Sequence, residues 1–187
     1  NKFRNAGQVC VSVNRFYIQE SVYDAFVSQL AAAVNDLKVG NGLEEGTVVG
    51  PLIEPAAVKK VREHVEDAVA KGATILAGGK AHDLGGNFWQ PTVLGDCHEG
   101  MALASEETFG PVAACFRFTS EEEVIQRANN TPFGLAAYFY TQNLQRVFRV
   151  SQAIESGMIG INECAVSTEL GPFGGVKESG LGREGSV

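Results

Sequence analysis

Amphipathic helical patterns and apolar strand patterns alternate along the whole of this 187-residue sequence. The apolar strand runs have no polar face, which is typical of strands that helices cover on both sides. We therefore expect an α/β fold, with a largely parallel sheet flanked by helices, in a single domain over residues 1–187. The helices are expected over residues 21–38, 55–72, 120–130 and 143–157, and the strands over 14–19, 73–79, 88–94, 110–118, 133–141 and 158–162.

Several local features sharpen these elements. Ser120 and Glu123 have capping-box spacing at the start of the third helix. His64 is expected on the polar, solvated side of the second helix. The Gly-rich tail over 171–185 lacks apolar periodicity, so it is expected to be a loop, and long ordered loops are often functional. Ser21 is the expected N-cap of the first helix, whose apolar stripe is expected at Val22, Phe26, Leu30, Val34 and Leu37.

Composition disfavours several classes of function. The formal net charge of −7 disfavours nucleic acid or an anionic membrane as partner. No apolar run approaches the ~20 residues that span a bilayer, and the first residues lack a signal-peptide core. Four cysteines without CxxC pairing and three histidines disfavour a zinc site or a disulfide framework. We expect a cytoplasmic protein with reduced thiols, no membrane partner and no metal.

The first candidate site is "KFRNAGQVC", residues 2–10. Gly7 permits a tight turn before Cys10. Lys2 and Arg4 supply positive charge that favours a thiolate. The remaining cysteines are expected to be small buried hydrophobes: Cys97, Cys115 and Cys164.

Two further stretches are candidates for chemistry. In "SEETFGPV" (105–112), Glu106 and Glu107 are either acid/base groups or part of a solvated loop. Phe109 and the Gly-Pro that follows give an aromatic and a turn before a buried strand, where α/β proteins often build ligand sites. In "STELGPFGGVKESGLG" (167–182), Phe173 is either core filler or a pocket wall. This stretch lacks the GxxxxGK[ST] pattern, so it is not a phosphate cradle.

Taken together, the stretches "FRNAGQVC", "EETFGPV", "NTPFGLAA" and "PFGGVKESGLGREG" resemble the aldehyde dehydrogenase family, in the same order and at similar spacing. The resemblance covers essentially the whole chain. Within the family, "KFRNAGQVC" and "INECAVSTELGPFGG" are most similar to succinate-semialdehyde dehydrogenases. Glutarate-semialdehyde dehydrogenases are also similar.

The resemblance implies a role for six residues and a cofactor, NAD or NADP. Cys10 matches the nucleophile that attacks the aldehyde. Glu107 matches the residue that binds the nicotinamide ribose, and Phe109 matches the aromatic beside the nicotinamide. Arg4 and Ser167 match the pair that recognises the substrate's distant carboxylate, and Phe173 matches a wall of the substrate tunnel.

The resemblance also implies that parts of the family's enzyme lie outside this sequence. The Rossmann-like cofactor-binding domain, the water-activating glutamate and the asparagine that helps hold the oxyanion have no match here. We therefore expect the catalytic domain of a longer, homo-oligomeric enzyme, and no turnover by the 187 residues alone. Ser12 stands where some relatives carry a second cysteine, so no disulfide from that position to Cys10 is expected.

Three different functions remain open from the sequence. One is a broader-specificity aldehyde dehydrogenase in which Arg4 is only structural. A second is a non-catalytic interaction domain. A third is a cysteine-dependent hydrolase, which needs a base such as histidine, and no histidine lies near Cys10 in the sequence.

Overall fold

The computed structural model describes residues 1–185, which form two compact units: Asn1–Thr119 is unit 1, and unit 2 begins at Ser120. The expected single domain over 1–187 stays a prediction, because it concerns whether the two units fold cooperatively.

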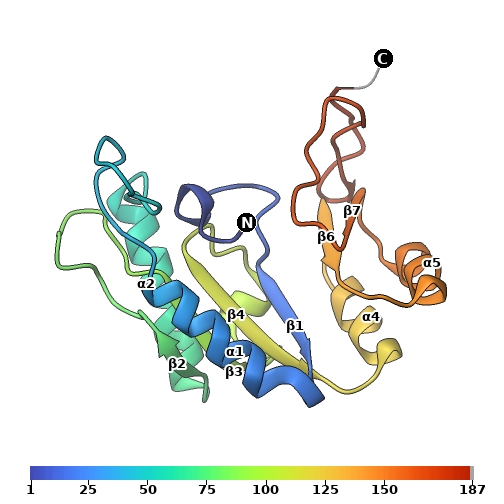
Figure 1. Cartoon of the computed structure of the whole chain (residues 1–187), viewed down its shortest axis with the longest axis horizontal. Coiled ribbons are helices and arrows are strands. Elements are labelled where there is room, and N and C mark those ends of the chain that lie inside the picture. The colour runs from blue at the N-terminus through green and yellow to red at the C-terminus, as the bar shows by residue number, and fades with distance from the viewer. Residues whose placement is uncertain (186–187) are drawn as a thin grey trace. The chain divides into compact units, whose positions relative to one another are not determined.

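Unit 1 is built on a four-stranded sheet in the order β1-β4-β3-β2 (Figure 1). Its strands are β1 (Arg15–Gln19), β2 (Thr74–Ala77), β3 (Thr92–Cys97) and β4 (Val112–Phe118). β4 pairs in parallel with both β1 and β3, and only the edge strand β2 is antiparallel. The expected α/β fold with a largely parallel sheet is confirmed.

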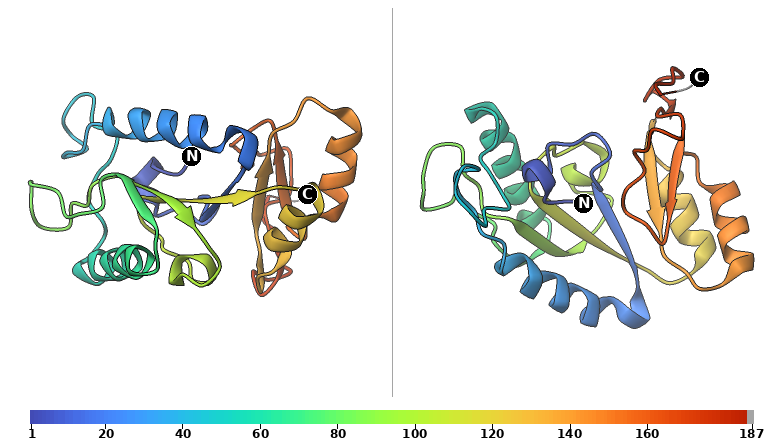
Figure 2. Two further views of the ribbon diagram at one scale, coloured as in Figure 1. Left: turned by 90° about the horizontal axis from the view of Figure 1, so that it is seen from below. Right: turned by 45° about the horizontal axis from the view of Figure 1, so that its top comes forward.

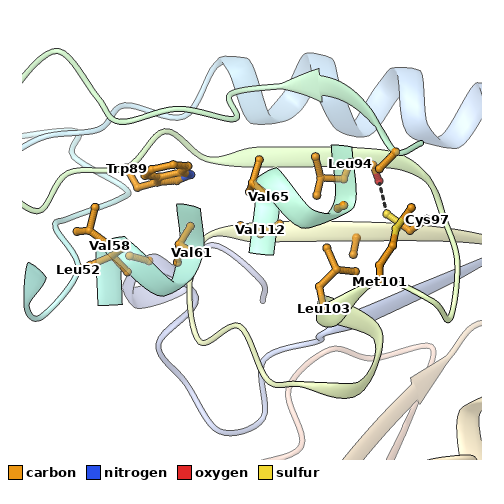
Figure 3. Packing of buried hydrophobic residues seen from close by; sticks show 14 of the residues in the cluster. Leu52, Val58, Val61, Val65, Trp89, Leu94, Cys97, Met101, Leu103 and Val112 are labelled. Atoms are coloured by element: carbon orange, nitrogen blue, oxygen red, sulfur yellow. Dashed lines mark hydrogen bonds between the residues drawn. The ribbon is translucent and has the colours of Figure 1, made fainter. Parts of the chain in front are cut away.

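Helices cover both faces of this sheet. Figure 2 shows α1 (Glu20–Asn35) on one side and α2 (Pro55–Ala70) on the other, and the short α3 (Ala102–Ser105) follows β3. Because strand side chains alternate between faces, Val93 packs with the α1 residues while Leu94 packs with the α2 residues. Figure 3 shows the α2 side, where Val61 and Val65 meet Trp89 and Leu94.

The first helix buries only part of the face expected: Val34 is buried, and Leu30 and Leu37 pack against its cluster. α1 begins at Glu20, so Ser21 lies inside it and is not the N-cap. Tyr23 and Val27 are buried, whereas Val22 and Phe26 are 53% and 41% exposed. Hydrogen bonds explain this register: the Tyr23 hydroxyl donates to the carbonyl of Cys115 at 3.2 Å and accepts from the amide of Asp96 at 2.6 Å.

The cysteines divide into two buried and two exposed thiols, all four of them free. Cys97 and Cys115 are buried as expected, and burial raises the pKa of each thiol to about 12. They belong to clusters on opposite faces of the sheet. Cys164 is exposed, so the expectation of a buried residue there is wrong.

Up to residue 185, unit 2 contains two helices and two short ladders. α4 (Glu121–Asn129) is capped by Ser120, whose side chain accepts from the amide of Glu123, as the spacing predicted. α5 (Leu144–Ala153) joins the parallel pair of β6 (Ala136–Phe139) and β7 (Met158–Ile161). The expected strand over 133–141 is interrupted, since β5 (Phe133–Gly134) pairs instead with β8 (Val176–Lys177), which lies in the tail that was expected to be a loop.

Over residues 1–185, none of the helices is long and apolar enough to cross a membrane.

Candidate active site

The segment before the candidate nucleophile forms a tight left-handed turn. Asn5 and Ala6 have φ values of 50° and 55°, and Gly7 follows at 75°. For a residue with a side chain, this left-handed conformation costs roughly 1–2 kcal/mol. Contacts with the surrounding structure must therefore stabilise the turn. A Cβ on Gly7 would lie 2.1 Å from the carbonyl oxygen of Gly110. The turn therefore packs directly on the backbone that leads into β4.

Gln8 ties this turn to a neighbouring loop and leaves Cys10 accessible. The Gln8 side chain donates to the carbonyl of Asn5 at 3.0 Å and accepts from the amide of Ile53 at 2.8 Å. Cys10 is exposed, and within residues 1–185 no hydrogen bond engages its backbone N–H. An accessible thiol beside a free N–H suits nucleophilic attack on a carbonyl and stabilisation of the resulting oxyanion.

The two cations of this segment lie in different environments. Arg4 is exposed, and its guanidinium makes no ion pair within the described part of the chain. Lys2 is only 5% exposed. Burial lowers the pKa of Lys2 from 10.5 to about 8, and the Glu107 carboxylate opposes that shift. The expected effect of these cations on the Cys10 thiolate stays a prediction.

The second candidate segment, residues 106–110, connects α3 to β4. Glu107 and Phe109 are exposed on either side of the buried Thr108. Phe109 has a φ of 49°, an unusual value for an aromatic residue. The segment thus presents a carboxylate and an aromatic ring outward from a backbone held in a strained conformation.

These two side chains fit a nicotinamide nucleotide. A carboxylate accepts from two ribose hydroxyls at once, and an aromatic ring offers a flat apolar surface to a planar heterocycle. Glu107 and Phe109 are both accessible for such contacts. Residues 1–185 contain no group of three or more His, Cys, Asp and Glu side chains placed to hold a metal ion.

The buried position of His64 contradicts the solvated one expected from the sequence. His64 is 4% exposed and lies on the buried face of α2, three residues after Val61. Its Nδ1 lies 3.0 Å from the Thr108 hydroxyl and its Nε2 lies 3.4 Å from the Glu106 carboxylate. Burial lowers the pKa of His64, and Glu106 opposes the shift. The three-residue spacing from Val61 was the sequence signal for this burial.

Asn14 is a second residue that sequence reasoning missed. Its Oδ1 accepts from the amide of Thr108 at 3.2 Å, and its Nδ2 donates to the carbonyls of Leu103 and Glu106 at 2.9 and 3.3 Å. An asparagine just before a strand carries no distinctive pattern, so nothing in the sequence pointed to this role.

In unit 2, Ser167 and Phe173 line a cavity of about 390 Å³. The backbone of Phe173 exchanges two 2.8 Å hydrogen bonds with that of Glu184. Glu169 and Glu184 also line the cavity, so its charged lining is acidic. The nearby Arg183 guanidinium donates to three backbone carbonyls, those of Gly175, Leu181 and Gly182.

The structure thus brings the predicted residues together in two groups. The turn that carries Arg4 and Cys10 touches the segment that carries Glu107 and Phe109, both in unit 1. Ser167 and Phe173 share the cavity of unit 2. The chemical roles of these six residues stay predictions.

Comparison with known proteins gives consistent results. The model of the Aldehyde dehydrogenase family matches residues 1–187. The chain is 60% identical to a glutarate-semialdehyde dehydrogenase of Pseudomonas putida and 56% identical to the succinate-semialdehyde dehydrogenase [NADP(+)] of Escherichia coli, in each case over 100% of this chain and 38% or 39% of the relative. The crystal structure of a succinate-semialdehyde dehydrogenase from Burkholderia pseudomallei superposes with a TM-score of 0.98 at 59% identity, covering 99% of this chain and 38% of that one. The chain therefore spans about 38% of the length of these proteins.

Proposed function

The chain belongs to the aldehyde dehydrogenase family, and from this premise we propose that it contributes the nucleophile to the NAD(P)-dependent oxidation of a semialdehyde that carries a carboxylate at its other end. The names of its relatives favour succinic or glutaric semialdehyde. We call a protein that contains these 187 residues and has the full length of such relatives the full-length enzyme. The observation that carries the proposal is the accessible Cys10, with its unengaged N–H, on a turn packed against the 106–110 segment.

In this proposal Cys10 forms and releases the covalent intermediates. Its thiolate attacks the aldehyde carbon and gives a thiohemiacetal, whose oxyanion accepts a hydrogen bond from the Cys10 N–H. Bound NAD or NADP supplies the two-electron oxidant. Oxidation leaves a thioester on the sulfur, and hydrolysis of the thioester gives the acid and regenerates the thiol. The water-activating glutamate and the second oxyanion donor are assigned to the rest of the full-length enzyme.

Glu107 and Phe109 are assigned to the cofactor. Glu107 would accept hydrogen bonds from the ribose hydroxyls, and Phe109 would pack beside the nicotinamide. The exposure of both side chains supports this assignment.

Arg4 and Ser167 are assigned to the distant carboxylate, and Phe173 to a wall of the substrate tunnel. Arg4 has an exposed guanidinium without an ion pair in residues 1–185, and a guanidinium binds a carboxylate with two parallel hydrogen bonds.

The nucleophile assignment is tested by Cys10→Ala in the full-length enzyme. We expect the rate of NAD(P)H formation to fall at least roughly a thousandfold, since the covalent route is removed. Cys164→Ala is the matched control, because Cys164 is the other exposed thiol, and it should leave the rate unchanged. Aldehyde oxidation that survives Cys10→Ala would show that Cys10 is not the nucleophile.

The carboxylate assignment is tested by Arg4→Ala, with kcat/KM measured for succinic semialdehyde and for an uncharged aldehyde of similar length. We expect a loss of roughly 10- to 100-fold for the charged substrate only, as for a lost charge-assisted hydrogen bond. An equal loss for both aldehydes would instead favour an enzyme of broader specificity in which Arg4 is structural.

Neither a cysteine-dependent hydrolase nor a non-catalytic interaction domain gains support from the geometry. For the hydrolase, no hydrogen bond within residues 1–185 joins a histidine to Cys10, and His64 is bonded to Thr108 and Glu106 instead. A non-catalytic interaction domain does not require the exposed thiol of Cys10 or the strained backbone of Phe109. The homo-oligomer, the cytoplasmic location and the absence of turnover by the 187 residues alone stay predictions.

A further inference from the structure

The buried histidine of α2 contacts the candidate cofactor segment at two points. His64 Nδ1 is 3.0 Å from Thr108 Oγ1, and Nε2 is 3.4 Å from a carboxylate oxygen of Glu106. A neutral imidazole satisfies both contacts if Nε2–H donates to Glu106 and Nδ1 accepts from the Thr108 hydroxyl. His64 therefore holds the two residues that flank Glu107 in the sequence.

The same face of α2 also contacts the far end of the segment. A Cβ on Gly110 would lie 2.3 Å from Val61 Cγ2, so the helix packs directly on the Gly110 backbone. One helical turn beyond His64, Asp67 accepts a 2.7 Å hydrogen bond from the amide of Ala102 at the start of α3, which leads into the segment. Together these contacts fix the path of the segment from its approach to its end.

Between these contacts lies the strained residue. Phe109 has a φ of 49° and stands between the bonded Thr108 and the packed Gly110. A non-glycine residue stays in such a conformation only when its surroundings over-determine it, and such residues cluster at functional sites. The Thr108 contacts to His64 and Asn14 are the ones nearest to Phe109 in the sequence.

We propose that His64 is a positioning residue, which through Thr108 and Glu106 holds the 106–110 segment so that Glu107 and Phe109 face the cofactor. Only the identity of the ligand that Glu107 and Phe109 face rests on the proposed function. That His64 holds the 106–110 segment concerns unit 1 alone, and it is tested without any cofactor.

The test compares His64→Leu with Val65→Ala in the 187-residue chain. Val65 is the next buried residue of α2 and packs in the core cluster. Val65→Ala therefore controls for a general loss of stability. The measurement is amide hydrogen exchange in peptides that cover 106–110. We expect about tenfold faster exchange there in His64→Leu, as for one lost buried hydrogen bond, and no such local change in Val65→Ala.

His64→Gln keeps a donor and an acceptor on a side chain of similar reach, so it should restore most of the protection. If His64→Leu does not fold, Thr108→Val removes the hydroxyl that His64 contacts and should likewise speed exchange over 106–110. In the full-length enzyme, His64→Leu should raise the Kd for NAD(P) about tenfold and leave the rate of Cys10 alkylation unchanged. Exchange over 106–110 no faster than in Val65→Ala would overturn the proposal. If the wild-type enzyme binds no dinucleotide, the proposed function fails, and the exchange data still decide the role of His64.

Discussion

Lys2 is a buried lysine, and burial of its charged form costs stability. The residue is only 5% exposed, and burial lowers its pKa from 10.5 to about 8. That difference corresponds to roughly 3 kcal/mol, since each tenfold change in proton affinity is worth about 1.4 kcal/mol. Strongly shifted groups of this kind cluster at functional sites, and here the group lies close enough to Glu107 for the two charges to interact.

Replacing Lys2 by methionine should therefore stabilise the chain. A methionine of similar length removes the desolvation cost, and we expect the free energy of unfolding at pH 7 to rise by roughly 1–3 kcal/mol. Between pH 8 and pH 10.5 the unfolded wild-type chain binds more protons at Lys2 than the folded one, so wild-type stability recovers as the pH rises. The difference between Lys2→Met and wild type should shrink to near zero at the top of this window.

Urea unfolding at several pH values from 7 to 10.5 measures both effects. Because other groups also titrate there, the quantity to follow is the difference between the two proteins. Lys80→Met is the matched control, since Lys80 is exposed, and it should show no pH-dependent difference. A Lys2→Met chain less stable than wild type at pH 7 would mean that the attraction to Glu107 outweighs the burial cost.

Helices and strands were predictable from the sequence where a single hydrophobic pattern indicated them. The apolar periodicity of residues 55–72 predicted α2, although His64 was wrongly expected on its solvated side, and wholly apolar strand runs between helical patterns predicted the largely parallel sheet. In α1 the prediction was wrong at Val22 and Phe26, because two apolar stripes overlap there and the hydrogen bonds of the Tyr23 hydroxyl decide between them. β8 was missed because two residues in a Gly-rich tail carry no period, and their pairing with β5 depends on distant sequence.

At the candidate site, the predictable part was the set of exposed side chains. Cys10 and Glu107 were identified by their motifs, and both are exposed. The supporting contacts were not predictable, because the bonds of Gln8, Asn14 and His64 join segments far apart in the sequence. Such contacts follow from the folded arrangement and not from local pattern.

The link between α4 and α5 gives a prediction for an element pair. Glu121 in the first turn of α4 pairs with both Arg149 and Arg146 of α5. Hydrogen bonds from Arg149 and then Arg146 lower the pKa of Glu121 to about 2. Glu121→Gln should lower the free energy of opening of unit 2 by about 1 kcal/mol at pH 7, since a two-arginine network is stronger than a single exposed pair.

The pH dependence of this pair has a definite sign. The folded-state pKa of Glu121 is depressed from 4.5, so its stabilising contribution is present above pH 4.5 and is lost as the pH falls toward about 2. Hydrogen exchange in α4 and α5 between pH 3 and 7 measures it. Glu122→Gln, in the same helical turn, is the control and should change little. A Glu121→Gln effect that persisted undiminished at the lowest pH would contradict the electrostatic explanation.

At the scale of the whole molecule, the two units differ in how much apolar surface they bury. Both core clusters consist of unit 1 residues, among them Trp89, Phe116 and Tyr23. In the described part of unit 2, the buried apolar side chains are those of Val150 and Met158. Because burial of apolar surface is the main stabilising term in folding, the two units should differ in their resistance to opening.

We therefore expect native-state hydrogen exchange to separate the two units. Amides of β6 and β7 should exchange with a free energy of opening at least about 2 kcal/mol below that of β3 and β4, and with a weaker dependence on urea, since less surface opens. Val150→Ala should lower only the free energy of opening of β6 and β7, and Val61→Ala only that of β3 and β4, by about 2 kcal/mol each. If all four strands instead shared one free energy and one urea dependence, residues 1–187 would open as a single cooperative domain, because local opening of unit 2 would then cost as much as global unfolding.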